Sequence, residues 1–311
     1  MGRKSILKRL IQLALGLIRS RGIARYSCKF SKKTFTQHQW LVLGVLKTYL
    51  KMDYRTFADW ILFSNDLFYI LRLKRRPHFT TLQKFLQRFD PSIFDQLIIA
   101  VFSQINATQK PLDVAVDGSG FTSSYCSRYF VMRINRETSY KSFMKMSIAV
   151  NPWSRALLAV KCRKGPAHDN KDFVPLLRRI DCRLRNVIAD KGYDCEANHR
   201  FIRNELDAEP VIPVKKNVAG CHKNKLRKRM KRLFLSNPYY KQVYGQRNIA
   251  ETVFSVIKRR FGGDLRSRLT ELKKKEMKLK ALTYNLMILT TDKSLFVVVG
   301  FLQSHLPEAF K

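Results

Sequence analysis

The sequence of 311 residues is short of acidic side chains: 23 Asp and Glu stand against 60 Lys and Arg, for a formal net charge of +37. A chain with so little negative charge repels itself unless a polyanion neutralises it. Nucleic acid is the usual polyanion, because Lys and Arg release the counterions of its phosphates. Attachment to ribosomes or to anionic lipid is the alternative. We therefore expect a nucleic-acid partner.

Cysteine is also scarce. Six cysteines are spread along the chain, and none forms a CxxC pair. This spread gives no disulfide framework, so we expect reduced thiols. Cys195 with His199, and Cys221 with His222, lack the paired spacing of a structural zinc site.

Long apolar runs are missing as well. The N-terminal segment 1–22 superficially resembles a signal peptide, but it has no small-residue cleavage site. Its Ile6, Leu10, Leu13 and Leu17 instead form one helical stripe. The run 295–302 is much shorter than the ~20 apolar residues of a membrane-spanning helix. We expect a cytoplasmic protein.

The periodicity of residues 1–110 predicts short helices. Asp53 is placed to cap one of them, and a Thr cap is expected at the start of 80–89. Short helices with basic exposed positions suit a helix-turn-helix DNA-binding region, and a plain helical bundle fits the periodicity equally well.

From residue 111 the pattern changes to that of a mixed α/β sheet flanked by helices. The segment 113–121 is expected to be a strand ending in a Gly-rich turn, and 141–164 two strands joined by a turn at Asn151-Pro152. Strands and helices then alternate, and residues 248–289 are helical. We expect domains at 1–110 and 111–290, followed by a tail at 291–311.

Three acids lie at positions suited to chemistry. Asp117 and Asp190 each follow an apolar strand and precede glycines, and Glu251 lies on a basic helix. Each has a simpler explanation: an Asp-Gly hairpin for Asp117, a turn or helix cap for Asp190, and a surface salt bridge for Glu251. Together they suit two divalent metals ~3.5–4 Å apart that promote phosphodiester displacement.

The spacing Tyr244, Arg247, Glu251, Lys258 is Y-x2-R-x3-E-x6-K. In this respect the chain resembles the DDE transposases of bacterial and archaeal insertion sequences. The DGSGF segment around Asp117 is similar to their first acidic motif. The segment GPAHDNKDFVPLL, followed by IADKGYD around Asp190, is similar to their second. The resemblance covers roughly residues 111–290.

The resemblance implies a ribonuclease H-like catalytic domain in which Asp117, Asp190 and Glu251 bind Mg²⁺, with two ions expected and Mn²⁺ able to substitute. It implies cleavage at transposon ends and strand transfer into target DNA. Tyr244, Arg247 and Lys258 would contact DNA phosphates. The implied partners are double-stranded DNA, both terminal inverted repeats and target, and further copies of the chain in a homodimer or larger assembly. The expected location is the prokaryotic nucleoid.

A basic run at 213–232 contains nine Lys or Arg and no acid. A solvated face is the common explanation of such a run, but its lack of acids favours phosphate contact. The predicted DNA-contacting residues of the run are Lys215, Lys216, Arg227, Lys228 and Arg229.

Two other functions are compatible with the sequence. One is a DNA-binding protein derived from a transposase and no longer catalytic, which the intact set of three acids disfavours. The other is a ribonuclease H-like nuclease that cleaves DNA without joining strands.

Overall fold

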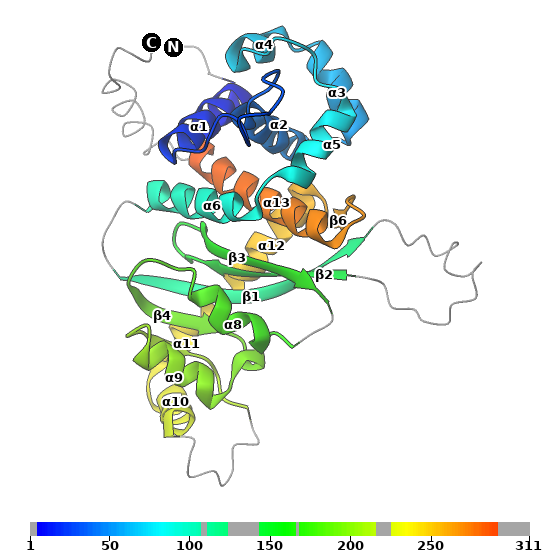
Figure 1. The fold of residues 1–311 in the computed structure, drawn as a ribbon. Coiled ribbons are helices and arrows are strands. Elements are labelled where there is room, and N and C mark those ends of the chain that lie inside the picture. The colour runs from blue at the N-terminus through cyan, green and yellow to red at the C-terminus, as the bar shows by residue number, and fades with distance from the viewer. Residues whose placement is uncertain (1–4, 107–110, 124–142, 166–167, 216–224, 292–311) are drawn as a thin grey trace, which may run out of the picture.

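The computed structural model describes residues 5–106, 111–123, 143–165, 168–215 and 225–291 (Figure 1). The predicted Lys216 and the tail after Thr291 lie outside these ranges, as do Cys221 and His222. Within the described ranges every helix is too short or too polar to cross a membrane.

A six-stranded mixed sheet forms the centre of the molecule, in the order β3-β2-β1-β4-β5, with β6 pairing the far end of β1. β2 runs antiparallel to β1 and β3, whereas β4, β5 and β6 add in parallel. The strands are β1 (Leu112–Ser123), β2 (Phe143–Val150), β3 (Leu157–Lys164), β4 (Leu184–Ala189), β5 (Glu209–Val211) and β6 (Asp264–Leu265). The predicted mixed α/β sheet is confirmed.

Alternation along β1 gives the sheet two different faces. Val114 and Val116 pack with Phe173 and Tyr193 on the face covered by α8 and α9. Ala115 and Phe121 belong to the larger core, which includes the buried residues of α12. The helices that follow the first strands are α8 (Asn170–Leu177), α9 (Glu196–Asn204), α10 (Lys225–Ser236), α11 (Pro238–Gly245) and α12 (Asn248–Phe261).

The N-terminal part is helical, as its periodicity predicted. Its helices are α1 (Ile6–Ser20), α2 (Gln37–Tyr49), α3 (Tyr54–Leu62), α4 (Asn65–Leu71), α5 (Phe79–Arg88) and α6 (Pro91–Ile105). In α1, Leu10, Leu13 and Leu17 are buried, whereas Ile6 is 51% exposed, so the stripe begins one turn later than expected. The Asp53 cap is confirmed, because its carboxylate accepts the backbone N–H of Arg55 and Thr56.

The expected Thr cap at 80–89 is wrong. α5 begins at Phe79, after His78, without a side-chain cap. Here Leu82 and Leu86 are buried, so packing of the apolar face fixes the helix without a capping hydroxyl.

The long helix α13 (Thr270–Thr291) joins the N-terminal helices to the sheet, and Figure 1 shows it beside α6 above the strands. Asn285 is buried on α13 and bonds both backbone groups of Leu157 on β3, and its amide also reaches Ile98 O on α6. Lys275 and Lys278 donate to carbonyl oxygens of residues 87 and 91. One helix is therefore buried against both parts of the chain.

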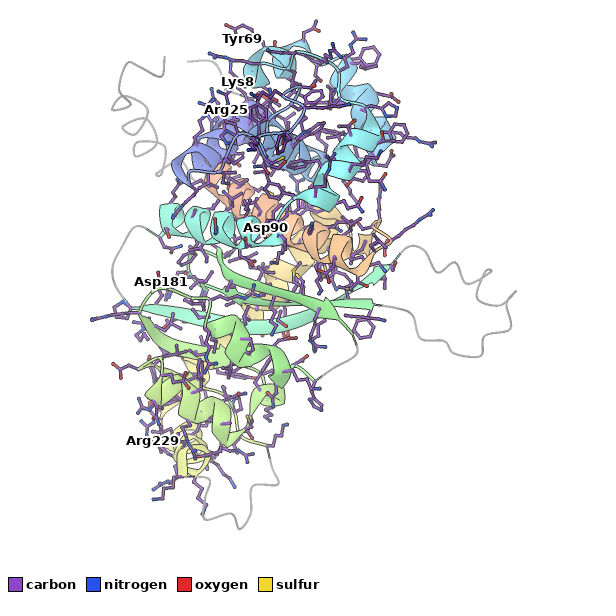
Figure 2. The ribbon with its side chains drawn as sticks, in the orientation of Figure 1. Lys8, Arg25, Tyr69, Asp90, Asp181 and Arg229 are labelled. Atoms are coloured by element: carbon purple, nitrogen blue, oxygen red, sulfur yellow. The ribbon has the colours of Figure 1, made fainter. Side chains whose placement is uncertain are left out.

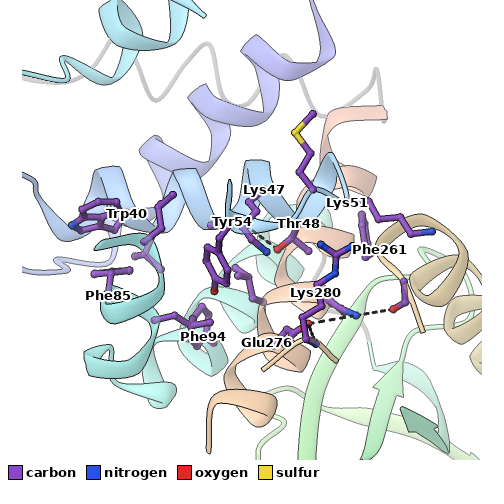
Figure 3. A pocket seen from close by; sticks show the side chains of 18 of the residues that line it. Trp40, Lys47, Thr48, Lys51, Tyr54, Phe85, Phe94, Phe261, Glu276 and Lys280 are labelled. Carbon is purple, nitrogen blue, oxygen red and sulfur yellow. Dashed lines mark hydrogen bonds and ion pairs between the residues drawn. The ribbon is translucent and has the colours of Figure 1, made fainter. Parts of the chain in front are cut away.

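A cavity of about 130 Å³ lies where α2, α5 and α6 meet the end of α12 and α13 (Figure 3). Aromatic side chains form much of its wall. Lys47 points into it with its ammonium 4.2 Å from the centre of the Tyr54 ring, and Glu276 and Lys280 face the same space. Burial lowers the pKa of Lys47 to about 8. No residue predicted for catalysis lines this cavity.

Candidate active site

Asp117 lies within β1, not at its end. The expected Gly-rich turn is wrong, because β1 continues through Gly118 and Gly120 to Ser123 and pairs with β2 from Ala115 to Thr122. The side chain of Lys145 on β2 fills the space beside Gly118: a Cβ at Gly118 would lie 2.9 Å from Lys145 Cε. The Asp-Gly hairpin is therefore excluded, and Asp117 is held in the antiparallel pairing of β1 with β2.

Asp190 lies directly after β4, where the sequence predicted the end of a strand. Val116 pairs with Ala189 in the parallel register, so Asp117 and Asp190 follow neighbouring positions on adjacent strands. The hydroxyl of Tyr244 donates a hydrogen bond to Asp190 Oδ1 at 3.2 Å. Tyr244, predicted from the spacing of its motif, thus contacts the second acid directly.

Glu251 lies in the first turn of α12, and its carboxylate is 2.8 Å from Arg247 Nη1. The salt bridge that offered the simpler explanation of Glu251 is therefore present. The side chain of Glu251 is 55% exposed, and exposed pairs of this i, i+4 type contribute ~0.3–0.5 kcal/mol. Stability alone is a weak reason for an acid in this basic segment.

The buried residues of α12 determine which side chains face the sheet. Helical periodicity predicts that Ile249, Val253, Val256 and Ile257 face the core. Val253 and Ile257 are fully buried and Phe254 is 4% exposed, whereas Ile249 and Val256 are partly buried. Lys258 then reaches β1, where its ammonium donates to Ser119 Oγ at 2.8 Å. Burial lowers the pKa of Lys258. The helix ends at Phe261 and is followed by Gly262, whose φ of 88° suits glycine.

The three acids influence one another electrostatically. Burial raises the pKa of Asp117; the Gly118 N–H and Arg247 oppose the shift, and the charges of Glu251 and Asp190 add to it. A carboxyl whose ionisation is disfavoured by two further carboxylates marks a local excess of negative charge. Carboxylate oxygens are the ligands that Mg²⁺ prefers, so the chemistry of this donor set fits a divalent cation. Among the described residues, however, no three acidic, His or Cys side chains converge closely enough to form a ready-made metal site.

The structure divides the predicted residues of the basic run. Arg227 binds Asp194 with two nitrogens, and Arg229 lies 3.0 Å from Glu209. Lys228 and Lys215 have exposed side chains. The guanidinium groups of Arg227 and Arg229 therefore already have carboxylate partners inside the protein. Lys215 and Lys228 are better placed for the expected phosphate contact.

Sequence reasoning missed the internal acids. Asp172 is 2% exposed and contacts Arg163, Lys161 and Ser147 on β2 and β3. Asp194 is 4% exposed and also bonds His199. Their partners lie up to 33 residues away along the chain, so local spacing carried no signal for either network.

The fold and these carboxylates define a class of protein. A mixed sheet with acids on adjacent parallel strands and a third on a helix over the same face is a ribonuclease H-like α/β domain, as the resemblance implied. The family model of the transposase DDE domain matches residues 108–286, more than half of the chain. The chain belongs to this family, and its function is that of a transposase acting on DNA. Comparisons with curated proteins and with solved structures give no match.

Proposed function

We propose that the protein is a DNA transposase that cleaves phosphodiester bonds at transposon ends and transfers the freed strands into target DNA. The observation that carries this proposal is the arrangement of the three acids: Asp117 and Asp190 occupy neighbouring positions on adjacent parallel strands, and Glu251 lies in the first turn of α12 over the same face. In agreement with this arrangement, burial raises the pKa of Asp117 and the charges of Glu251 and Asp190 add to the rise. Perturbed acids of this kind are concentrated at functional sites. The salt bridges that neutralise other buried acids in this protein are absent around Asp117 among the described residues.

Asp117, Asp190 and Glu251 are the residues that would hold Mg²⁺ or Mn²⁺, most simply as a pair of ions. Bound there, such ions would activate the attacking oxygen and stabilise the leaving oxygen. Tyr244 orients the Asp190 carboxylate through its hydrogen bond. Arg247 pairs with Glu251, and Lys258 bonds Ser119, two residues along β1 from Asp117. In these positions the two cations would bind the phosphates on either side of the reacting bond.

A cleavage and strand-joining assay tests the proposal. The full chain would be incubated with duplex DNA carrying the element's own ends and with Mg²⁺ or Mn²⁺. We expect cleavage and joining to disappear in Glu251→Gln. Glu271→Gln is a matched control, because Glu271 is likewise an exposed helical acid that pairs with a nearby cation, Lys274; this variant should keep full activity.

Each result has a definite meaning. Cleavage without joining would favour the ribonuclease H-like nuclease. Binding of DNA without cleavage by the wild type would favour a transposase-derived DNA-binding protein. Activity that survives Glu251→Gln would remove Glu251 from the site.

A further inference from the structure

The basic helix α10 has two chemically different sides. Six of its twelve residues are Lys or Arg, and none is acidic. Figure 1 shows α10 at the end of the molecule opposite α3 and α4, and Figure 2 shows Arg229 among its side chains.

The inner side of α10 anchors the helix to the protein. Arg227 binds the buried Asp194 through Nε at 2.9 Å and Nη2 at 2.6 Å. Arg229 binds Glu209, whose carboxylate also accepts the hydroxyl of Tyr240. Met230, on the same side of the helix, is 1% exposed. The charges of Arg227 and Arg229 are therefore already neutralised by Asp194 and Glu209.

The start of α10 is also fixed. The carboxylate of Glu196 on α9 accepts the backbone N–H groups of Leu226 at 3.1 Å and Arg227 at 3.2 Å. These are N–H groups of the first helical turn, which have no acceptor inside the helix. Among the described residues, the contacts that set the orientation of α10 about its axis therefore lie on one side of the helix.

The outer side carries cations without acidic partners. Its exposed basic side chains, which we call the α10 stripe, are Lys225, Lys228, Lys231 and Arg232. Within the described part of the chain, none of the four forms a salt bridge. Four like charges on one helix face repel one another, so the stripe lowers the stability of the free protein and is suited to bind an anion.

Two side-chain contacts link α10 to the candidate active site. Phe234, near the end of α10, packs against Tyr244 on α11 with ring centroids 5.9 Å apart. Tyr244 in turn donates to Asp190. A ligand held on the α10 stripe is thus positioned relative to Asp190 through two side-chain contacts.

We propose that the α10 stripe binds the phosphate backbone of double-stranded DNA, while Arg227 and Arg229 act as structural anchors. The stripe extends ~10 Å along the helix axis, a length over which a duplex carries about six phosphates. This inference rests on the proposed function, because it takes DNA as the substrate. It assigns the contact to a set of residues that differs from the one expected from the sequence.

The test measures the salt dependence of binding to a 30-base-pair duplex by fluorescence anisotropy. In the stripe variant, Lys225, Lys228, Lys231 and Arg232 are all changed to Gln. Each phosphate contact contributes ~0.9 to the slope of log affinity against log salt concentration. We expect the slope to fall by about 2 to 4 in the stripe variant. Its melting temperature by circular dichroism should be equal to or higher than that of the wild type, because the repulsion among the four charges is removed.

Two comparison variants make the test specific. The charge control changes Lys164, Lys171, Arg183 and Arg200 to Gln, which removes the same charge from exposed positions outside both α10 and the N-terminal helices; its slope should fall by less than half as much. The anchor variant, Arg227→Gln with Arg229→Gln, should melt at a lower temperature and keep the wild-type slope at temperatures where it is folded.

The inference is overturned if the stripe variant keeps the wild-type slope, or if the charge control or the folded anchor variant loses as much slope as the stripe variant. Failure of the proposed function looks different: the wild type itself would then show no salt-dependent affinity for duplex DNA.

Discussion

Asp117, on the α12 face of the sheet, and Asp194, beneath α10, have pKa values that shift in opposite directions. Burial alone would raise the pKa of Asp194, but hydrogen bonds from His199 and Arg227 lower it below the ordinary value of 3.8. Burial also raises the pKa of Asp117, and there the neighbouring acids add to the rise. Similar side chains in one protein thus have two uses: a neutralised acid stabilises the fold, and an acid left without compensation is available for a ligand.

The largest effect is expected at Asp117. Asp117→Asn should reduce cleavage on the order of 10⁴-fold, as for residues that act within a catalytic unit, which corresponds to about 5 kcal/mol of activation free energy. The same change should leave the melting temperature unchanged or raise it at pH 7, because it removes a charge whose ionisation is disfavoured.

Chemical denaturation at several pH values measures how the effect of Asp117→Asn on the free energy of unfolding depends on pH. A raised folded-state pKa means that the ionised carboxyl destabilises the fold above that pKa and that protonation removes the penalty. Any stabilisation by Asp117→Asn should therefore disappear as the pH falls below about 4. A large destabilisation at pH 7 would place Asp117 with the structural acids instead.

The second prediction concerns Asp194. Asp194→Asn should lower the free energy of unfolding by about 3–5 kcal/mol, because it leaves the partly buried Arg227 without its carboxylate. Urea denaturation at pH 7 measures the change. Glu205→Gln is the control: it breaks an exposed pair with Arg178 and should cost less than about 1 kcal/mol.

The pH dependence should be opposite to that of Asp117. Because the folded-state pKa of Asp194 is lowered, its contribution is present above about pH 4 and is lost as the pH falls through the folded-state value. The wild type and Asp194→Asn should converge in acid. A constant difference from pH 7 to pH 3 would contradict this explanation.

A smaller effect on the free energy of unfolding is expected at Lys47, a cation whose pKa is shifted by burial as that of Asp117 is. Its ammonium lies in the apolar cavity, and burial lowers its pKa to about 8 from 10.5. Lys47→Met should raise the free energy of unfolding at pH 7 by about 1–2 kcal/mol, because the gain from removing the desolvated charge exceeds the loss of the cation–π contact with Tyr54. The unfolded wild type binds more protons between pH 8 and 10.5, so its stability rises over that range and the advantage of the variant should shrink.

Denaturation at pH 7 and pH 10 tests both the stabilisation at pH 7 and its decrease at higher pH. Lys84→Met, at an exposed position, is the control. The explanation fails if Lys47→Met is destabilising at pH 7 or if its effect does not change with pH.

The smaller of the two effects on cleavage is expected at Tyr244. Tyr244→Phe removes the hydroxyl bond to Asp190 and keeps the ring contact with Phe234. A single hydrogen bond to a charged group contributes ~1.5–3 kcal/mol, so cleavage should slow by roughly 10- to 100-fold, with DNA affinity nearly unchanged. A loss confined to DNA affinity would assign Tyr244 to binding alone.

Local patterns predicted much of the fold. Periodicity indicated the N-terminal helices, the β2–β3 hairpin and the buried side of α12, and Asp53 marked the start of α3 correctly. The continuation of β1 past Asp117 could not be predicted locally, because residues 118–122 are held in the strand by pairing with β2, which lies more than 20 residues further along the chain. The same holds for the anchors of α10, since Asp194 and Glu209 meet Arg227 and Arg229 only after the chain has folded.

The burial of α13 against both the N-terminal helices and the sheet has a consequence for cooperativity. Asn285 satisfies backbone groups of β3 and α6 at once, and Lys275 and Lys278 donate to carbonyl oxygens of the N-terminal region. Separation of the two parts would leave these polar groups buried without partners or expose apolar surface, both of which carry a large free-energy cost. Thermal unfolding should therefore occur as a single transition that includes both parts, so that loss of the candidate active site and loss of the N-terminal helices coincide.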